Sequence, residues 1–154
     1  MAVVNRVVVN LLREGRQADL KAAGVSMLPM LWPRMALHVE PRNAEDIKRG
    51  DIVVYISNSD KLIAHRVVAT DAQYIVTRGD SCLTSDPLFD KQSIAGVVTK
   101  VRVLGRYFST INLCSRLYAK VLFALSPLSY YFNHLMAMCV MKFLIIRGQL
   151  RDAQ

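Results

Sequence analysis

Apolar residues are spaced in two different ways along this chain, and the change falls near residue 16. Over residues 3–13 they come in pairs four positions apart, which places one apolar stripe along a helix. Gly15 is expected to end this helix, because glycine is favoured just beyond a helix end. At about 1.5 Å per residue such a helix is too short to cross a hydrocarbon layer of ~30 Å, and it lacks the cleavage site of a signal peptide.

Short β-rich runs separated by turn-forming residues follow. The predicted strands are residues 20–25, 35–39, 51–56, 62–70, 74–77 and 94–104. Gly50, Asn58 and Gly79 are among the turn formers between them. Because no long helices alternate with these runs, a parallel α/β fold is disfavoured. The sequence predicts a mainly β sandwich or barrel-like sheet.

The last part of the chain is apolar and is expected to be helical. Residues 121–141 contain no Lys, Arg, Asp or Glu, which is just long enough to span a bilayer. Pro127 and the polar neighbours Asn133 and His134 are costly in lipid. Two helices broken at the proline, packed on the core or lying on a membrane surface, are therefore an open alternative to a span.

Length and composition support one folded unit with appendages. The chain has 154 residues, and its 53% hydrophobic residues exclude intrinsic disorder. We expect an α+β chain that is mainly β, with three regions: an N-terminal amphipathic helix (1–15), a β-rich core (16–105) and an apolar helical tail (106–154). The net charge of +8 would suit nucleic acid or an anionic membrane. Without a Lys/Arg run or interleaved aromatics, however, nucleic acid is not expected as a partner.

The three cysteines, Cys82, Cys114 and Cys139, have no CxxC spacing. Neither a disulfide framework nor a zinc site is suggested, so we expect free, mostly buried thiols in a reducing compartment. No metal or cofactor is expected.

Three segments in a fixed order supply a hydroxyl, an imidazole and two carboxylates. They carry Ser26, His65, and the pair Asp80 and Asp86. A serine hydroxyl attacks an amide when a base takes its proton and a third group orients that base. These residue types predict acyl transfer to Ser26.

The nucleophile and the base each have a structural alternative. Ser26, between Gly24 and Pro29, would stand at a strand-to-turn junction with its N–H exposed to an oxyanion, or be an ordinary turn serine. His65 lies among apolar neighbours and could accept the Ser26 proton, although a lone strand histidine is more often structural. His38, in an alternating strand, has less context for catalysis.

Asp80 and Asp86 compete for the third role. Asp80 follows Gly79, where an Asx-type turn would let its carboxylate accept backbone N–H groups, which is a structural duty. Asp86 lies in a loop and has no such local duty. We therefore expect Asp86 to orient His65 and Asp80 to support the site.

These segments resemble the signal peptidase group of serine peptidases, which includes the LexA-type self-cleaving repressors. The resemblance covers residues 24–104 and rests on four ordered blocks: Gly-x-Ser-Met-x-Pro at 24–29, Arg-Gly-Asp-Ile-Val-Val at 49–54, His-Arg-Val-Val at 65–68, and Gly-Asp-Ser at 79–81 followed by Ser85 and Asp86. It implies a signal-peptidase-like core. It also implies a serine endopeptidase that binds an extended peptide beside a strand, with small side chains near the cleaved bond.

The resemblance also implies roles. The family uses either Lys or His as general base, and His65 stands directly before Arg66, where the lysine branch has its lysine. The nearest lysine, Lys61, is about 13 Å away along a strand. Ser26 would then be the nucleophile, His65 the base and Asp86 the third member. The supporting positions would be Asp80, Gly24 and Met27.

Three departures from the family pattern affect the expected function. Gly24 stands where many relatives have a serine that donates to the oxyanion, which predicts weaker activity. Trp32, Pro33 and Arg34 replace a usual Gly-Asp pair, so this turn should differ. The residues before Ser26 cannot form the family's membrane anchor. With no export signal and only an anchor or surface contact through the tail, the core would stay on the cytoplasmic side of a membrane. Maturation of a small cytoplasmic peptide or protein is then an alternative to cleavage of secreted precursors.

Two other functions would fit parts of the sequence. A non-catalytic module could keep the peptidase fold to bind an extended peptide or a membrane partner, and a wide separation of Ser26 from His65 would favour it. A self-cleaving regulator would need a DNA-binding segment ahead of the core. About two dozen residues are too few for a helix-turn-helix unit.

Overall fold

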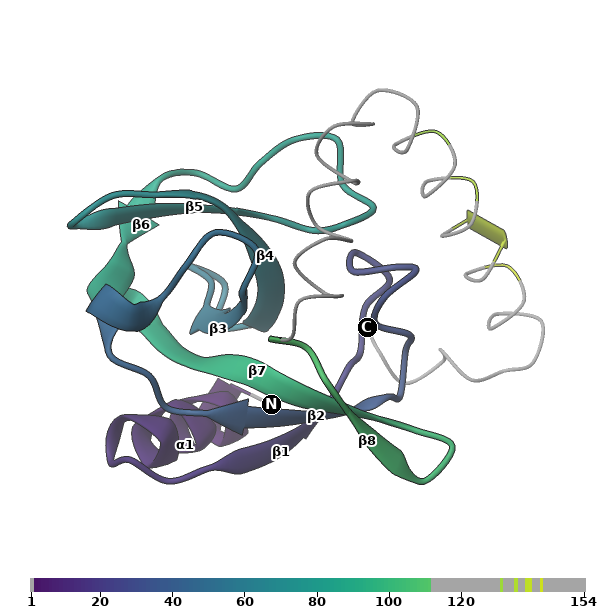
Figure 1. Ribbon diagram of the computed structural model, residues 1–154, viewed down its shortest axis with the longest axis horizontal. Coiled ribbons are helices and arrows are strands. Elements are labelled where there is room, and N and C mark those ends of the chain that lie inside the picture. Colours follow the sequence, from purple (N-terminus) through teal and green to yellow (C-terminus); the bar gives the residue numbers. More distant parts are fainter. Residues whose placement is uncertain (1, 112–130, 132–134, 136–137, 140–141, 143–154) are drawn as a thin grey trace.

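A curled antiparallel sheet forms the framework of the protein, as the computed structural model shows (Figure 1). The structure describes residues 2–111 and, beyond them, Tyr131, Leu135, Met138, Cys139 and Lys142. The helical elements are α1 (Ala2–Arg13) and the short 3-10 turns η1 (Ala44–Asp46) and η2 (Lys91–Ser93). The strands are β1 (Ala18–Lys21), β2 (Ala36–Glu40), β3 (Ile52–Ile56), β4 (Leu62–Thr70), β5 (Tyr74–Arg78), β6 (Phe89–Asp90), β7 (Ile94–Val103) and β8 (Arg106–Ser109). The prediction of a mainly β chain with a short N-terminal helix is confirmed.

The strands follow the order β1-β2-β7-β3-β4-β5-β6, and β8 pairs with β7 off this path. β7 pairs with β2 along one edge. Along its other edge it pairs first with β3, where Val97 lies opposite Val53, and later with β8, where Lys100 lies opposite Ser109. One long strand therefore connects the site-bearing half of the sheet, β3 to β6, to the β7–β8 hairpin.

Helix α1 ends as its sequence predicts. Gly15 has a φ of 83° and donates its N–H to Leu12, while Arg16 donates to Leu11, which is the hydrogen-bond pattern of a glycine-terminated helix end. On its inner face, Val9 and Leu12 are buried against the sheet.

Two apolar clusters lie on opposite faces of β3, because successive side chains of a strand alternate. Ile52 and Val54 join the cluster that also holds the buried residues of α1. Val53 and Tyr55 join a second cluster with Val67 of β4. Val53 also lies directly opposite His65, so the second face carries the site.

The sequence prediction was wrong at the strand expected over residues 20–25. β1 begins at Ala18 and ends at Lys21. Beyond it, Ala22 still exchanges hydrogen bonds with Arg34 and Met35, and the chain then turns out of the sheet. The carbonyl of Val25 accepts from Leu28 instead of from a neighbouring strand, so the segment before Ser26 is not a strand.

The expected tail begins differently from the prediction, because β8 occupies its first residues. Tyr131, Leu135, Met138, Cys139 and Lys142 are helical and exposed. Most of the predicted tail, including Cys114, Pro127, Asn133 and His134, lies outside the described residues. Within the described part of the chain, no helix is long and apolar enough to cross a membrane.

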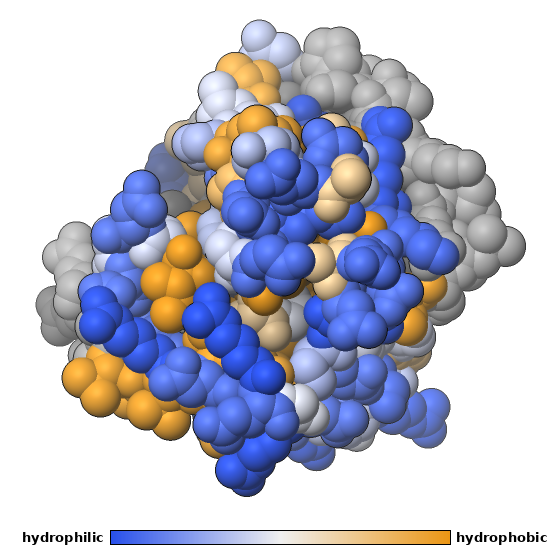
Figure 2. All heavy atoms as spheres, turned by 90° about the vertical axis from the view of Figure 1, so that its left-hand side faces the viewer, coloured by the Kyte–Doolittle hydropathy of each residue, from blue (hydrophilic) through white to orange (hydrophobic). Residues whose placement is uncertain are grey.

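The side of the molecule near α1 and β6 is largely hydrophilic, with hydrophobic patches between the polar residues (Figure 2). A groove of about 800 Å³ is lined by the end of α1, the chain after β2 and the start of β7. Arg13, Arg42, Glu45 and Asp46 line it. The groove contains none of the predicted site residues.

Candidate active site

His65 is positioned by the interior of the sheet. It lies in β4, which pairs with β3 on one side and β5 on the other, and its side chain is almost fully buried. Lys61 is exposed, and its N–H contacts Ser57 in the turn before β4. The histidine therefore occupies the site, and the lysine lies in the turn.

Ser26 lies in the turn that follows β1 and is half-buried. This turn continues through a cis peptide bond between Leu28 and Pro29. Ser26 Oγ is 3.0 Å from Nε2 of His65, which is hydrogen-bond distance. The hydroxyl and the imidazole are thus joined directly.

Asp86 completes the chain of hydrogen bonds from the loop after β5. Its Oδ2 is 2.7 Å from Nδ1 of His65. The backbone N–H of Asp86 donates to the carbonyl of Thr77, which folds the loop back along β5. The structure therefore brings Ser26, His65 and Asp86 together in the order that the sequence predicts.

Two hydroxyl groups also point at the Asp86 carboxylate. Thr77 Oγ1 donates to Oδ2 at 2.6 Å and Tyr55 Oη donates to the same oxygen at 3.0 Å. Each hydroxyl carries one proton, so both protons are used on Asp86. Thr77 is fully buried and Tyr55 nearly so.

These donors keep the carboxylate ionised despite its burial. Burial is the largest single effect on the pKa of Asp86 and raises it, but the hydrogen bonds from His65, Thr77 and Tyr55 outweigh burial and hold the pKa below its usual value. Burial, reinforced by the nearby Asp86 charge, raises the pKa of Tyr55 to about 12. Asp86 is therefore an acceptor and Tyr55 a donor at neutral pH.

The loop after β5 also holds Ser26 in place. Ser81 donates its backbone N–H to the Ser26 carbonyl at 2.8 Å and its hydroxyl to the Val25 carbonyl at 2.8 Å. Gly79 permits this close approach, because a Cβ there would lie 2.6 Å from the Ser26 carbonyl oxygen. No side chain fits at this position without displacing Ser26.

The Ser26 amide N–H is available to a ligand. In a trans peptide the carbonyl and the N–H point in opposite directions, so anchoring the Val25 carbonyl on Ser81 turns the Ser26 N–H away from that loop. Among the described residues, no hydrogen bond engages this N–H. It could stabilise a negative oxygen beside Ser26.

Asp80 has a different partner from the one expected. Instead of an Asx-type turn, its carboxylate makes a bidentate ion pair with Arg66, at 2.8 Å to Nε and 2.7 Å to Nη2. Arg66 also donates to the Gly50 carbonyl and contacts the Met30 sulfur. The pair is buried beneath the site and links β4 to the loop that holds Ser26.

The other predicted positions take lesser places. Met27 is buried in the core and does not face the site. A Cβ built at Gly24 would meet only the Ser26 nitrogen, at 4.0 Å, so the space beside it is open. At the divergent turn, Met35 donates its N–H to Trp32, and Arg34 takes a φ of 70°.

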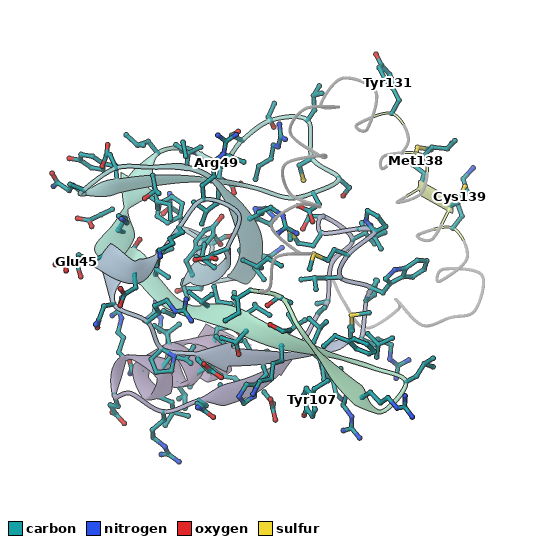
Figure 3. All side chains as sticks on the ribbon, in the orientation of Figure 1. Glu45, Arg49, Tyr107, Tyr131, Met138 and Cys139 are labelled. Atoms are coloured by element: carbon teal, nitrogen blue, oxygen red, sulfur yellow. The ribbon has the colours of Figure 1, made fainter. Side chains whose placement is uncertain are left out.

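Neither the cysteines nor any metal-binding group among the described residues adds to the chemistry of the site. Burial, followed by the Asp86 charge, raises the pKa of the half-buried, free Cys82, which makes it a poor nucleophile. Cys139 is free but exposed, contrary to the expectation of mostly buried thiols, and is labelled in Figure 3. The described residues contain no group of His, Cys, Asp and Glu that could hold a metal ion.

Tyr55, Thr77, Ser81 and Arg66 are site residues that the sequence analysis did not assign. The sequence does hint at a buried Thr77. This polar residue lies two positions after the buried Ile75, and residues two apart in a strand face the same side. The place of Tyr55 in the site could be inferred only from the register of β3 against β4. In that register Val53, two positions before Tyr55, lies opposite His65.

Searches against family models, curated proteins and solved structures found no match to this chain.

Proposed function

We propose that this chain is a serine endopeptidase of the signal peptidase-like type that cleaves an extended peptide or precursor. The observation that carries the proposal is the continuous hydrogen-bonded chain from Ser26 through His65 to Asp86. This is the arrangement in which a neutral hydroxyl becomes a nucleophile.

Ser26 Oγ attacks the carbonyl carbon of the scissile peptide bond, and His65 Nε2 takes the hydroxyl proton. The Asp86 carboxylate accepts Nδ1–H of His65, so Nε2 is free to act as the base. The negative oxygen of the tetrahedral intermediate is bound by the Ser26 N–H.

The bond to the leaving amine then breaks, and His65 donates its proton to the amine nitrogen. Water attacks the resulting acyl ester, with His65 again taking a proton, and the acid product leaves with Ser26 restored. Each proton that His65 accepts is returned, so no other co-reactant is needed.

The segment before Ser26 can receive an extended substrate. Ala23 and Gly24 are exposed, and within the described residues their backbone groups make no hydrogen bonds. Unpaired backbone N–H and C=O groups next to a nucleophile can pair with a peptide strand and present its carbonyl to Ser26.

The separation of Ser26 from His65 does not favour the non-catalytic alternative. It would be favoured by a Ser26 hydroxyl out of reach of His65, whereas the two atoms are 3.0 Å apart. Peptide binding without cleavage remains the outcome that would restore it.

The test is cleavage of a mixed library of unstructured peptides by the full chain, read by mass spectrometry. We expect new termini with the wild-type chain and a loss of at least about 10³-fold with Ser26→Ala or His65→Ala. Ser109→Ala and His38→Gln are matched controls, since both residues lie outside the site.

Two results would contradict the proposal. One is cleavage that persists unchanged in Ser26→Ala and His65→Ala, which would indicate a contaminating peptidase. The other is saturable peptide binding by the wild-type chain with no cleavage from pH 6 to about 9, the range in which histidine bases work.

A further inference from the structure

The turn that joins β7 to β8 carries an unusual residue. Leu104 and Gly105 have φ values of 48° and 84°, so both central positions of this two-residue hairpin turn are left-handed. Asn, Asp or Gly are favoured at the first position, and a leucine there adopts a costly backbone conformation. Leu104 is also 100% exposed, so its side chain gains no burial in return.

Apolar side chains continue along the hairpin. Tyr107 is 51% and Phe108 53% exposed. They are adjacent in β8 and project to opposite faces, with Tyr107 opposite Arg102 and Phe108 opposite Val101. The tip therefore presents a leucine between two aromatic faces. Figure 1 shows the hairpin extending from the sheet, and Figure 3 labels Tyr107 at the lower edge of the molecule.

The hairpin itself carries only basic charges, although Asp19 and Glu40 lie nearby on β1 and β2, beside the His38 ring that contacts Tyr107. Residues 1–90 contain 11 basic and 11 acidic residues, whereas residues 91–151 contain nine Lys and Arg and no Asp or Glu. The basic residues are scattered, but the acidic ones are confined to the rest of the chain. On the hairpin, Lys100, Arg102 and Arg106 are exposed, and the Arg102 guanidinium lies 5.9 Å from the Tyr107 ring.

Helix α1 also exposes apolar residues, but its charge is different. Val4 is exposed there, while neighbouring Arg6 is neutralised by an ion pair with Asp60. Among the described residues no ion pair involves Lys100, Arg102 or Arg106, so exposed apolar residues lie beside unpaired cations at the hairpin, whereas Arg6 beside Val4 is paired.

We propose that the tip of the β7–β8 hairpin binds the surface of an anionic lipid bilayer. Leu104, Tyr107 and Phe108 insert among the headgroups and upper acyl chains, where aromatic residues are favoured. Lys100, Arg102 and Arg106 lie at the level of the lipid phosphates. A bilayer explains both the strained, exposed leucine and the absence of acidic residues from the hairpin itself, and this proposal is independent of the peptidase activity.

The experiment measures sedimentation of the full chain with vesicles of phosphatidylcholine alone and of phosphatidylcholine mixed with phosphatidylglycerol. We expect binding to the mixed vesicles that weakens as salt rises. Leu104→Asn should lower this partitioning about fivefold or more, and Arg106→Gln about fivefold on the anionic vesicles only. Asn suits a left-handed position, so Leu104→Asn should keep the melting temperature.

Leu88→Asn is the matched control, because Leu88 is 60% exposed and lies outside the hairpin. A second probe is Leu104→Trp in a Trp32→Phe background, which leaves one tryptophan at the tip. Its emission should shift to shorter wavelength with anionic vesicles.

Three outcomes would overturn the proposal. The first is vesicle binding that Leu104→Asn and Leu88→Asn leave equally unchanged. The second is binding without any shift of the tip tryptophan, which would assign the contact to another part of the chain. The third is no vesicle binding but tight binding of a single-stranded oligonucleotide that Leu104→Asn weakens.

Discussion

Thr77 Oγ1 donates a hydrogen bond to Asp86 Oδ2 over 2.6 Å, and the Asp86 backbone N–H donates in return to the Thr77 carbonyl. Thr77 of β5 thereby holds Asp86 in place and, together with His65 and Tyr55, lowers its pKa. The orientation of His65 depends on this exchange, because the same Oδ2 accepts from Nδ1 of His65.

Thr77→Val keeps the shape of the side chain and removes the donor. Hydrogen bonds to a charged group are worth roughly 1.5–3 kcal/mol, so we expect kcat to fall about 10- to 100-fold with little change in KM. The Thr77 donation lowers the pKa of Asp86, and its loss raises that pKa. The acid limb of the kcat/KM profile should therefore move to higher pH.

The lowered pKa of Asp86 also makes the folding stability depend on pH. The pKa of Asp86 is depressed in the folded chain, so its stabilisation is present above the unfolded pKa and is lost as pH falls through the folded value. Thr77→Val narrows the gap between the folded and unfolded pKa of Asp86, so the variant should be less stable at neutral pH and should lose less stability on acidification than the wild type. Thr99→Val, at a buried threonine of β7, is the control. An acid limb identical in both variants would show that Thr77 does not act on Asp86.

Gly79→Ala tests the close approach of the loop to the nucleophile. Its Cβ would lie 2.6 Å from the Ser26 carbonyl oxygen and 3.0 Å from the Ser26 Cβ, so the turn must shift. We expect about 1–3 kcal/mol of destabilisation and a loss of about 100-fold in kcat. Gly24→Ala, where the space is open, is the control for thermal melting and peptide cleavage. Equal activity of the two variants would refute the steric argument.

Gly24→Ser should increase activity. Neither space nor a positive φ requires glycine there, and a Cβ would sit 4.0 Å from the Ser26 nitrogen, the proposed oxyanion donor. A serine hydroxyl added beside that N–H supplies a second donor, for which we expect kcat to rise about tenfold. Comparison with Gly24→Ala separates the hydroxyl from the loss of backbone freedom. A serine variant no faster than the alanine variant would contradict this role.

Asp80→Ala should destabilise the fold by about 3–5 kcal/mol, because it removes the carboxylate that makes a bidentate ion pair with the fully buried Arg66 guanidinium. Urea unfolding measures this loss. Replacing both members, as in Arg66→Met with Asp80→Leu, should recover part of it, since no unpaired charge then remains buried. If Asp80→Ala unfolds at the wild-type urea concentration, the pair is not a structural anchor.

Tyr55→Phe should change stability at alkaline pH. In the unfolded chain tyrosine loses its proton near its ordinary pKa of 10.0, but in the folded chain it holds the proton until about 12. Unfolding therefore releases a proton between these values, and stability falls as pH rises through them. The phenylalanine variant lacks this pH dependence. Its free energy of unfolding, measured relative to the wild type, should therefore be about 1–2 kcal/mol higher at pH 12 than at neutral pH. Parallel pH dependence of the two proteins would contradict the pKa of Tyr55.

The sequence located some elements closely because their signals are local. β4 has the predicted bounds of residues 62–70, and Gly15 ends α1 as expected. The order of Ser26, His65 and Asp86 is also a property of the chain alone. A local pattern of residue types was enough to place all of these.

Other features depended on contacts across the chain. β8 was missed because all its residues are exposed, so no alternation of buried and exposed positions marks it. The carbonyl of Val25 is held by Ser81, 56 residues away, and this contact converts an expected strand into a turn. Asp80 meets Arg66 for the same reason, because only the folded sheet brings the loop beneath β4.

The three members of the site differ in how far apart they lie in the sequence. His65 and Asp86 are separated by 21 residues and joined through adjacent strands, whereas Ser26 lies 39 residues from His65. Contacts between nearby residues form at lower entropic cost than distant ones. The contact between His65 and Asp86 can therefore form within the β4–β5 unit, and the docking of the Ser26 turn is the longer-range step that would complete the proposed site.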